Sequence, residues 1–342
     1  PALMGNTVLW KPASSAIYSG HFIMELFRQA GLPDCVINFI PAKASLIDEL
    51  VLAHPDLAGL HFTGSSGVFT HLWQRMAGQL STYRKYPRIV GETGGKDFVF
   101  AHASAEVDSL ATALVRGAFE YQGQKCSAAS RAYIPQSLWP ELKDLMLSQL
   151  ARIRLGDVRD FSNFMNAVID AKAFARIKGF IDSARASSQA EILFGGGSDD
   201  SEGYFIQPTV VHVADPHFIT MREEIFGPLL SIYVYPDRDY EETLRLCDAT
   251  SPYALTGAIF ATDRQAILLA DDLLQQAAGN FYINDKPTGA VVGQQPFGGS
   301  RASGTNDKAG SPANLMRWTS LRTVKENFLP PLDFAYSFAK EP

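Results

Sequence analysis

Short apolar segments alternate with longer segments of helical periodicity along the chain, and this alternation constrains the fold more than any other feature. The helical segment 19–30 ends at Gly31-Leu32-Pro33, a typical stop signal. Strands that alternate with helices form mostly parallel sheets covered by helices on both faces. We therefore predict an α/β protein. In the first hundred residues the predicted strands are 8–10, 36–40, 59–62 and 89–91, and the predicted helices are 19–30, 46–53 and 64–80.

The second half of the chain alternates in the same way with longer elements. We place a domain boundary near residues 94–98 and expect residues 329–342 to be irregular. Helices are predicted at 105–119, 140–153, 171–187 and 240–247, strands at 229–235, 281–284 and 318–324, and glycine-rich loops at 195–203 and 289–304.

Composition argues against several classes of protein. Of the 342 residues, 46% are hydrophobic and 19% are charged, which suits a large core and argues against disorder. The net charge is −6 and no basic block stands out, so nucleic acid is not expected as a partner. No apolar run reaches the roughly 18 residues that a membrane helix needs, so no membrane association is expected.

The three cysteines, Cys35, Cys126 and Cys247, are far apart and show no Cys-x-x-Cys spacing. We therefore expect neither a disulfide framework nor a metal site. We expect the protein to act in a reducing compartment. The chain begins at Pro1 without a methionine, within a run that predicts a helix end, a turn and a strand. We expect it to be a piece of a longer protein that lacks its N-terminal part.

Cys126 is the best candidate for a nucleophile. Small and polar residues surround it, which predicts an accessible loop leading into a helix. A thiol at a helix N-terminus gains thiolate character. A buried structural cysteine is the alternative from residue type alone. Cys35 and Cys247 fit that alternative, because apolar residues in regular elements flank them.

Glu92 is the candidate general base. It lies between a predicted strand and the glycines Gly94 and Gly95. These glycines would let the chain turn sharply and place the carboxylate in a cleft, where it could take a proton from a thiol or a water. An ordinary surface carboxylate is the alternative.

Three further segments are candidate ligand contacts. Gly64 and Ser65 follow a strand and open a helix, whose N–H groups and positive end favour a phosphate. Lys11 follows a strand and would point at the ligand crevice of a parallel sheet. Glu224 and Phe226 could offer a carboxylate and a ring on one side. The alternatives are a turn without a ligand, a solvated lysine and a solvated acidic turn.

In this order and spacing, the five segments resemble the aldehyde dehydrogenase superfamily over about residues 1–327. Longer stretches resemble the branch that oxidises L-glutamate γ-semialdehyde to L-glutamate in proline catabolism. The resemblance implies a parallel-sheet cofactor-binding domain, an α/β catalytic domain and an oligomerisation strand with its tail, which we assign to 1–95, 96–315 and 316–342. The longer matching stretches are 119–128, 280–286, 294–299 and 301–307.

The resemblance implies NAD as the cofactor. Lys11 matches the residue that bonds the adenosine ribose. Ser65, with Gly64, matches the pyrophosphate contact at a helix start. Glu224 matches the acid that bonds the nicotinamide ribose, and Phe226 packs nearby.

The resemblance also implies the catalytic and substrate-binding residues. Cys126 is similar to the thiolate that attacks the aldehyde, and Glu92 matches the base that activates the hydrolytic water. A small-molecule substrate, a homodimer or higher homo-oligomer and the mitochondrial matrix are implied in the same way. The substrate positions are Ser127, Gly289 and Ala290, which hold the α-carboxylate, and Phe297, which lines the tunnel.

The chain departs from the family pattern at several positions. Ser14 stands where many members carry a glutamate that helps to bind the NAD ribose, so a strict preference for NAD over NADP is not implied. Ala290 replaces a serine, and Thr93 replaces a leucine or cysteine. The family's oxyanion-hole asparagine precedes Pro1. The alternatives are an enzyme for another semialdehyde or aliphatic aldehyde, and an inactive truncated NAD-binding or assembly protein.

Overall fold

The computed structural model describes residues 1–339. Its largest element is a sheet of seven strands, in which neighbours run parallel except for β7, which is antiparallel to β10. The mostly parallel sheet predicted from the sequence is therefore confirmed. In spatial order the strands are β14 (Asn280–Ile283), β13 (Thr256–Phe260), β5 (Asp97–Ala101), β6 (Ala129–Pro135), β11 (Leu229–Tyr235), β10 (Thr209–Val213) and β7 (Ala190–Phe194).

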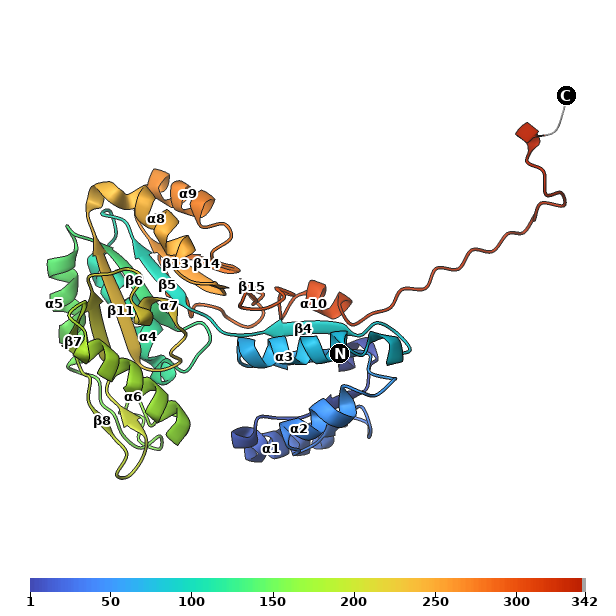
Figure 1. Ribbon diagram of the computed structural model, residues 1–342, viewed down its shortest axis with the longest axis horizontal. Helices are drawn as coiled ribbons and strands as arrows, with labels where there is room; N and C mark the ends of the chain where they lie inside the picture. The colour runs from blue at the N-terminus through green and yellow to red at the C-terminus, as the bar shows by residue number, and fades with distance from the viewer. Residues whose placement is uncertain (340–342) are drawn as a thin grey trace.

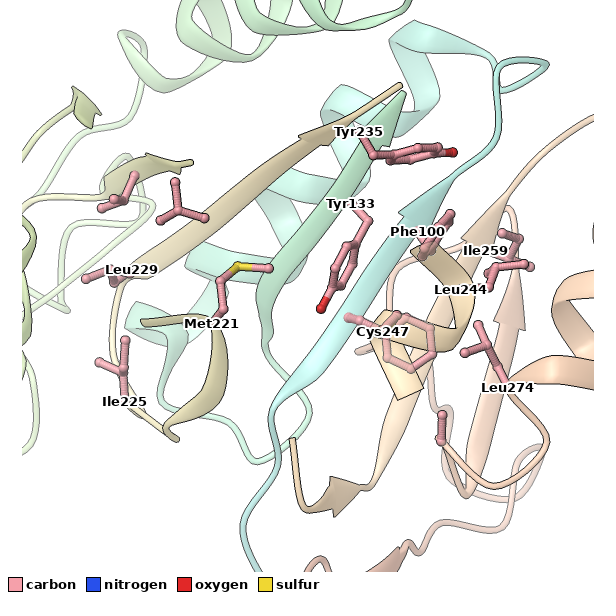
Figure 2. Packing of buried hydrophobic residues seen from close by; sticks show 14 of the residues in the cluster. Phe100, Tyr133, Met221, Ile225, Leu229, Tyr235, Leu244, Cys247, Ile259 and Leu274 are labelled. Atoms are coloured by element: carbon pink, nitrogen blue, oxygen red, sulfur yellow. The ribbon is translucent and has the colours of Figure 1, made fainter. Parts of the chain in front are cut away.

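Helices cover both faces of this sheet because side chains of successive strand residues point to opposite faces. In β5, Phe98 and Phe100 pack on one face, whereas Val99 and Ala101 pack on the other. Figure 2 shows the first face, where Cys247 is fully buried among aromatic and aliphatic side chains, as predicted. One face is covered by α4 (Val107–Phe119) and α5 (Trp139–Leu150), and the other by α6 (Ala171–Ala186), α8 (Tyr240–Ala249) and α9 (Arg264–Leu273).

Residues 1–92 contain two separate pairs of parallel strands. The predicted helix at 46–53 is instead a short α-helical turn that continues as the π-helical turn Ile47–Val51. Cys35 is exposed in a turn with a φ of 64°, so the expectation that it is buried is wrong. The elements are β1 (Val8–Trp10) paired with β2 (Ile37–Phe39), β3 (Gly59–Thr63) paired with β4 (Arg88–Glu92), α1 (Ile17–Gln29), α2 (Ala44–Leu46) and α3 (Ser66–Ala77).

Small elements connect these units. The glycine-rich segment 195–203 contributes a strand to a short antiparallel pair, and the segment 289–304 ends in another. The pairs are β8 (Ser198–Asp199) with β9 (Phe205–Ile206), and β12 (Tyr253–Ala254) with β15 (Ser300–Arg301). The short helices are α7 (Ile219–Arg222), α10 (Pro312–Met316) and the 3₁₀ turns Ala2–Met4, Ser14–Ala16, Leu80–Thr82, Glu120–Gly123, Asp237–Asp239 and Ser337–Ala339.

The C-terminal segment does not form the predicted strand. Trp318 is buried and its ring stacks on His61 with 5.6 Å between centroids, but residues 319–327 have no sheet partner. A strand needs the hydrogen bonds of a neighbouring strand, and this segment leaves the body of the molecule (Figure 1). No helix among residues 1–339 is long and apolar enough to cross a membrane.

Candidate active site

The segment between β4 and β5 brings the two candidate catalytic residues together. A Cβ built on Gly95 would lie 2.2 Å from the carbonyl oxygen of Cys126, and one built on Gly94 would lie 2.5 Å from Oε2 of Glu224. Only glycine fits at position 95, because a side chain there would overlap the backbone of Cys126. Glu92, which ends β4, is two residues before Gly94. The sequence motif around Glu92 therefore packs against the Cys126 turn, as the functional interpretation requires.

Cys126 lies in a turn that leads into strand β6, not into a helix as predicted. The helix before it, α4, ends at Phe119 because Tyr121 and Gln122 adopt left-handed φ angles of 56° and 57°. Burial, helped by nearby carboxylates, raises the pKa of the Cys126 thiol to about 12. The expected thiolate stabilisation by a helix end is therefore wrong, and the resting group is a neutral thiol. The carboxylates are Asp97, Glu92 and Glu224.

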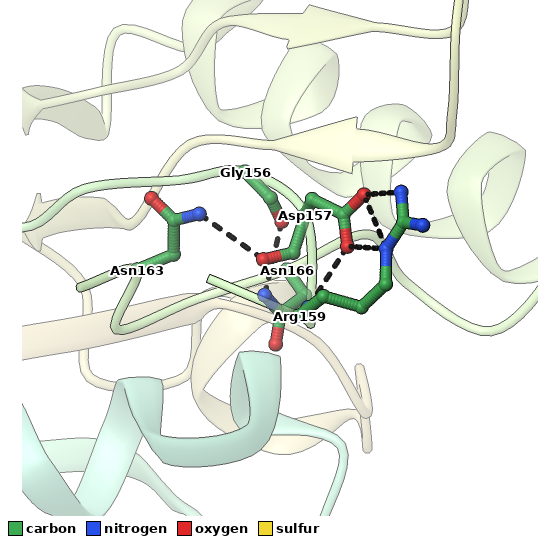
Figure 3. A network of polar contacts seen from close by, with 5 residues as sticks. All are labelled: Gly156, Asp157, Arg159, Asn163 and Asn166. Carbon is green, nitrogen blue, oxygen red and sulfur yellow. Dashed lines mark hydrogen bonds and ion pairs between the residues drawn. The ribbon is translucent and has the colours of Figure 1, made fainter. Parts of the chain in front are cut away.

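The turn before Cys126 is held by side-chain amides. Oε1 of Gln122 accepts a hydrogen bond from the Asn166 N–H at 3.1 Å, and Oε1 of Gln124 accepts one from the Ile169 N–H at 3.0 Å. The loop that supplies these donors is itself stabilised, since Asn166 donates to the Gly156 carbonyl at 2.9 Å (Figure 3). The left-handed backbone before the nucleophile is thus fixed from the side of the 156–169 loop.

Glu92 has the environment of a base that works near neutral pH. Both carboxylate oxygens are buried and have no hydrogen-bond partner within residues 1–339. Burial raises the pKa of Glu92 to about 7, the Asp307 charge acts in the same direction, and the Lys308 charge opposes them. A general base is most effective when its pKa lies near the working pH. Asp307 and Lys308 were not predicted, since a charged pair after a glycine-rich loop resembles an ordinary solvated turn.

Glu224 points back towards the glycines. Its Oε1 accepts a hydrogen bond from the Gly95 N–H at 2.9 Å. Burial raises the pKa of Glu224, whereas the Gly95 N–H and the charges of Arg176 and Lys96 lower it. Phe226 is half-buried and has a φ of 54°, so the chain turns sharply between Glu224 and β11.

Three buried ionisable side chains lie behind the nucleophile and were not predicted from the sequence. Asp97 accepts a hydrogen bond from the Thr256 N–H at 2.6 Å, and burial raises its pKa to about 7. Burial disfavours the charged form of Lys96 as well, which for an ammonium group lowers the pKa, here to about 7. Arg131 donates from Nε to the Lys96 carbonyl at 2.8 Å. Burial of charged residues is not visible in a sequence pattern, although the pair 96–97 directly precedes an apolar strand.

The candidate cofactor residues lie at the carboxyl ends of parallel strands. Lys11 directly follows β1, and Gly64 directly follows β3. Ser65 is the N-cap of α3, where its side chain accepts from the Val68 N–H at 3.4 Å. Gly64 and Ser65 are exposed. This end of α3 can therefore accept an anion, because the first N–H groups of a helix have no partner within it and the residues before it are exposed.

The candidate substrate residues come from the Cys126 turn and from the loop after β14, and the carboxylate of Glu120 connects the two segments. Glu120 Oε2 accepts from Nζ of Lys125 at 3.1 Å and from Nζ of Lys286 at 3.2 Å. Lys286 also donates to the carbonyl and the hydroxyl of Thr288. This network ties the turn that carries Cys126 and Ser127 to the loop that carries Gly289 and Ala290. Gly289 is half-buried, Ala290 is exposed, and Phe297 forms a backbone bridge with Ala309.

Comparisons with known proteins agree with this geometry. The model of the aldehyde dehydrogenase family matches residues 1–324. The mitochondrial delta-1-pyrroline-5-carboxylate dehydrogenase of Dictyostelium discoideum is 56% identical over 344 residues, 100% of this chain and 62% of that protein. The human protein of the same name is 51% identical over 339 residues, 99% of this chain and 60% of that protein.

A solved structure is similar over the same region. The crystal structure of the delta-pyrroline-5-carboxylate dehydrogenase from Mycobacterium tuberculosis bound with NAD matches with a TM-score of 0.92 and 54% identity, over 98% of this chain and 62% of that chain. The chain thus spans about three fifths of the length of the curated relatives it matches.

Proposed function

Because this chain belongs to the aldehyde dehydrogenase family, we propose that its protein oxidises L-glutamate γ-semialdehyde to L-glutamate, with NAD as the hydride acceptor, in proline catabolism. The observation that carries this proposal is the packing of the Gly94-Gly95 segment against both Cys126 and Glu224, two residues after Glu92. The names of the relatives support the choice of substrate, and the NAD bound in the Mycobacterium tuberculosis crystal structure supports the choice of cofactor.

The first half of the reaction begins at the thiol. Because the pKa of Cys126 is about 12, the thiol must give up its proton as it attacks, and Glu92 is the base at hand. Sulfur adds to the aldehyde carbon and gives a thiohemiacetal. NAD, when bound, supplies the hydride acceptor. Loss of the hydride from the thiohemiacetal leaves a thioester on Cys126.

The second half of the reaction is hydrolysis. Glu92 releases the thiol proton to solvent, then takes a proton from a water, and the resulting hydroxide adds to the thioester carbon. The carbon–sulfur bond then breaks, the carboxylic acid leaves, and the sulfur takes the proton held by Glu92. Glu92 can serve both halves because its buried carboxyl has a pKa of about 7 and changes its charge easily near neutral pH.

The residues present suit NAD. We propose that Lys11 bonds the adenosine ribose, that Gly64 and Ser65 hold the pyrophosphate, and that Glu224 bonds the nicotinamide ribose beside Phe226. Two observations support the fit: the N-terminus of α3 is exposed, and the carboxylate of Glu224 is held in place by the Gly95 N–H at 2.9 Å.

We propose that the substrate's α-carboxylate is held by Ser127 and the backbone of Gly289 and Ala290, while Phe297 lines its path. The lysine pair on Glu120 supports this proposal. The two ammonium groups share one carboxylate there, which ties together the segments that carry these contacts.

Three wider features belong to the same proposal. The cofactor-binding part ends near residue 95 and the catalytic part near residue 315. The protein forms a homodimer or higher homo-oligomer through residues 316–342, and it acts in the mitochondrial matrix. The word mitochondrial in the names of the relatives supports the last point.

The test is NADH formation with glutamate semialdehyde, compared with an aliphatic aldehyde of the same length that lacks the amino acid group. The proposal expects a kcat/KM at least about tenfold higher for the semialdehyde, since a charge-assisted hydrogen bond contributes about 1.5–3 kcal/mol. Equal values would leave an aldehyde dehydrogenase of another specificity. NAD binding without oxidation of either aldehyde would contradict the proposed activity.

A further inference from the structure

We propose that Lys308 is a positioning residue for Glu92, which holds the turn that walls the carboxylate and supplies the positive charge beside it. This inference rests on the proposed function, because it assumes that Glu92 acts as the base on the Cys126 thioester.

Lys308 is a clamp between two segments. Its Nζ donates to the carbonyl of Gly279 at 2.6 Å, to the carbonyl of Gly298 at 2.9 Å and to Oδ1 of Asn280 at 3.3 Å. Gly279 directly precedes β14, whereas Gly298 lies in the glycine-rich loop before β15. Asn280 strengthens the same link, since its Oδ1 accepts from the Gly298 N–H at 3.2 Å.

The clamped turn is the wall of the Glu92 site. A Cβ built on Gly298 would lie 3.1 Å from Oε1 of Glu92 and 3.3 Å from the backbone nitrogen of Lys308. Phe297 and Ala309 exchange backbone hydrogen bonds of 2.9 and 2.7 Å next to it. The two segments that carry Gly298 and Lys308 therefore lie together against the carboxylate, and the ammonium group fixes their separation.

The backbone of this segment is strained in a way that suits a functional role. Asn306 and Lys308 have φ angles of 54° and 53°, in the left-handed region that costs energy for residues other than glycine. Asp307, between them, is hydrogen-bonded to the Thr305 hydroxyl and lies 3.5 Å from Arg317. These contacts of Asp307, with the Ser311 hydroxyl that donates to the Lys308 carbonyl at 2.7 Å, thus hold Lys308 in an unfavourable conformation that directs it to Gly298.

The number of hydrogen-bond acceptors separates two possible roles. A lysine ammonium carries three hydrogens, and here it has three oxygen acceptors. Glu92 has no hydrogen-bond partner within the described chain. Lys308 therefore acts on Glu92 through its charge and through the position of the turn, rather than by passing it a proton.

The charges that face Glu92 are few. Lys308 stabilises the ionised carboxylate and Asp307 opposes it, while the Cys126 thiol is the other titratable group coupled to it. The Glu92 charge in turn raises the pKa of Lys308, although burial lowers it overall. Removing the ammonium charge leaves burial and Asp307 unopposed, so Glu92 would hold its proton to a higher pH.

Hydrolysis of p-nitrophenyl acetate tests this inference without the aldehyde or the cofactor. The ester acylates the Cys126 sulfur and releases p-nitrophenol, and water then releases acetate from the thioester with Glu92 as base. The measurement is the pH profile of deacylation for Lys308→Met and Lys308→Arg, with the exposed Lys85→Met as the matched control.

For Lys308→Met we expect the acid limb to move to higher pH, so that the deacylation rate falls by about tenfold more below the limb than on the alkaline plateau. Lys308→Arg and Lys85→Met should keep the wild-type limb. A uniform loss at every pH with an unmoved limb would show a structural role and overturn the inference. Lys308→Gln, which keeps an amide donor, repeats the test if the methionine variant does not fold.

The outcome is distinguishable from a failure of the proposed function. If glutamate semialdehyde is not oxidised but the Lys308→Met limb moves, the inference stands and the substrate is wrong. If the wild-type protein shows no ester hydrolysis that depends on Cys126, both are overturned.

Discussion

Gly95 and Cys126 are in contact through the backbone, since a Cβ on Gly95 would lie 2.2 Å from the carbonyl oxygen of Cys126. The segment that follows the general base is thereby packed against the nucleophile's own peptide group. The relative position of Glu92 and Cys126 depends on the missing side chain of Gly95.

Gly95→Ala should therefore abolish most activity. The added methyl group must displace the Cys126 turn, and overpacking of this kind costs about 1–3 kcal/mol of stability. A displacement of about 1 Å at a reacting group lowers the rate by about a hundredfold. The measurements are kcat/KM and the melting temperature. Gly179→Ala, inside α6, is the control, because nothing lies within 4 Å of its Cβ position, and it should leave kcat/KM near wild type without lowering the melting temperature.

The cysteines should separate catalysis from packing. Cys126→Ala should abolish oxidation and leave stability nearly unchanged. Cys247→Ala should keep activity and lower the free energy of unfolding by about 1 kcal/mol, because Cys247 is fully buried in the core. Activity assays and chemical denaturation check both variants. Turnover by Cys126→Ala would rule out covalent catalysis at this residue.

Hydrolysis of the thioester should depend on pH through Glu92. The base is active when ionised, and its pKa is raised to about 7. The deacylation rate should therefore fall about tenfold per pH unit below that value and level off above it. Single-turnover kinetics across pH would reveal the limb. If the deacylation rate between about pH 5 and about pH 7 equalled the plateau rate, the assignment of Glu92 as base would be contradicted.

Glu92 should also cost stability at neutral pH. Its pKa is raised from 4.5 to about 7 in the folded protein. Between these values the folded chain keeps a proton that the unfolded chain releases, so the free energy of unfolding falls as pH rises. Glu92→Gln should remove this contribution and stabilise the protein by about 1–3 kcal/mol at alkaline pH, with little change below the lower value. Chemical denaturation of both proteins, below pH 4.5 and above pH 7, measures this difference in the free energy of unfolding. Equal stability of the two proteins at both pH values would contradict the buried, unpaired state of Glu92.

The α/β class could be predicted from the sequence because each strand and each helix has its own residue pattern, and the order of these patterns shows the alternation. The predicted helix 105–119 ends where α4 ends, at Phe119, but the left-handed backbone at Tyr121 and Gln122 was not predicted, because neither residue is a glycine. The sequence also missed Lys96, Asp97 and Lys308, since a charged residue does not reveal its burial in a sequence pattern. The C-terminal strand was wrong because a β-favouring composition does not supply a partner strand.

The covalent centre can be tested most directly by trapping its intermediate. Rapid acid quenching of the wild-type protein during turnover with glutamate semialdehyde and NAD should stop hydrolysis and preserve an acylated protein, because Glu92, the base for hydrolysis, is protonated at low pH. Intact and peptide mass spectrometry should find the acyl group on the peptide that contains Cys126. An acyl group on Cys35 or Cys247, or continued turnover without any adduct, would contradict the account.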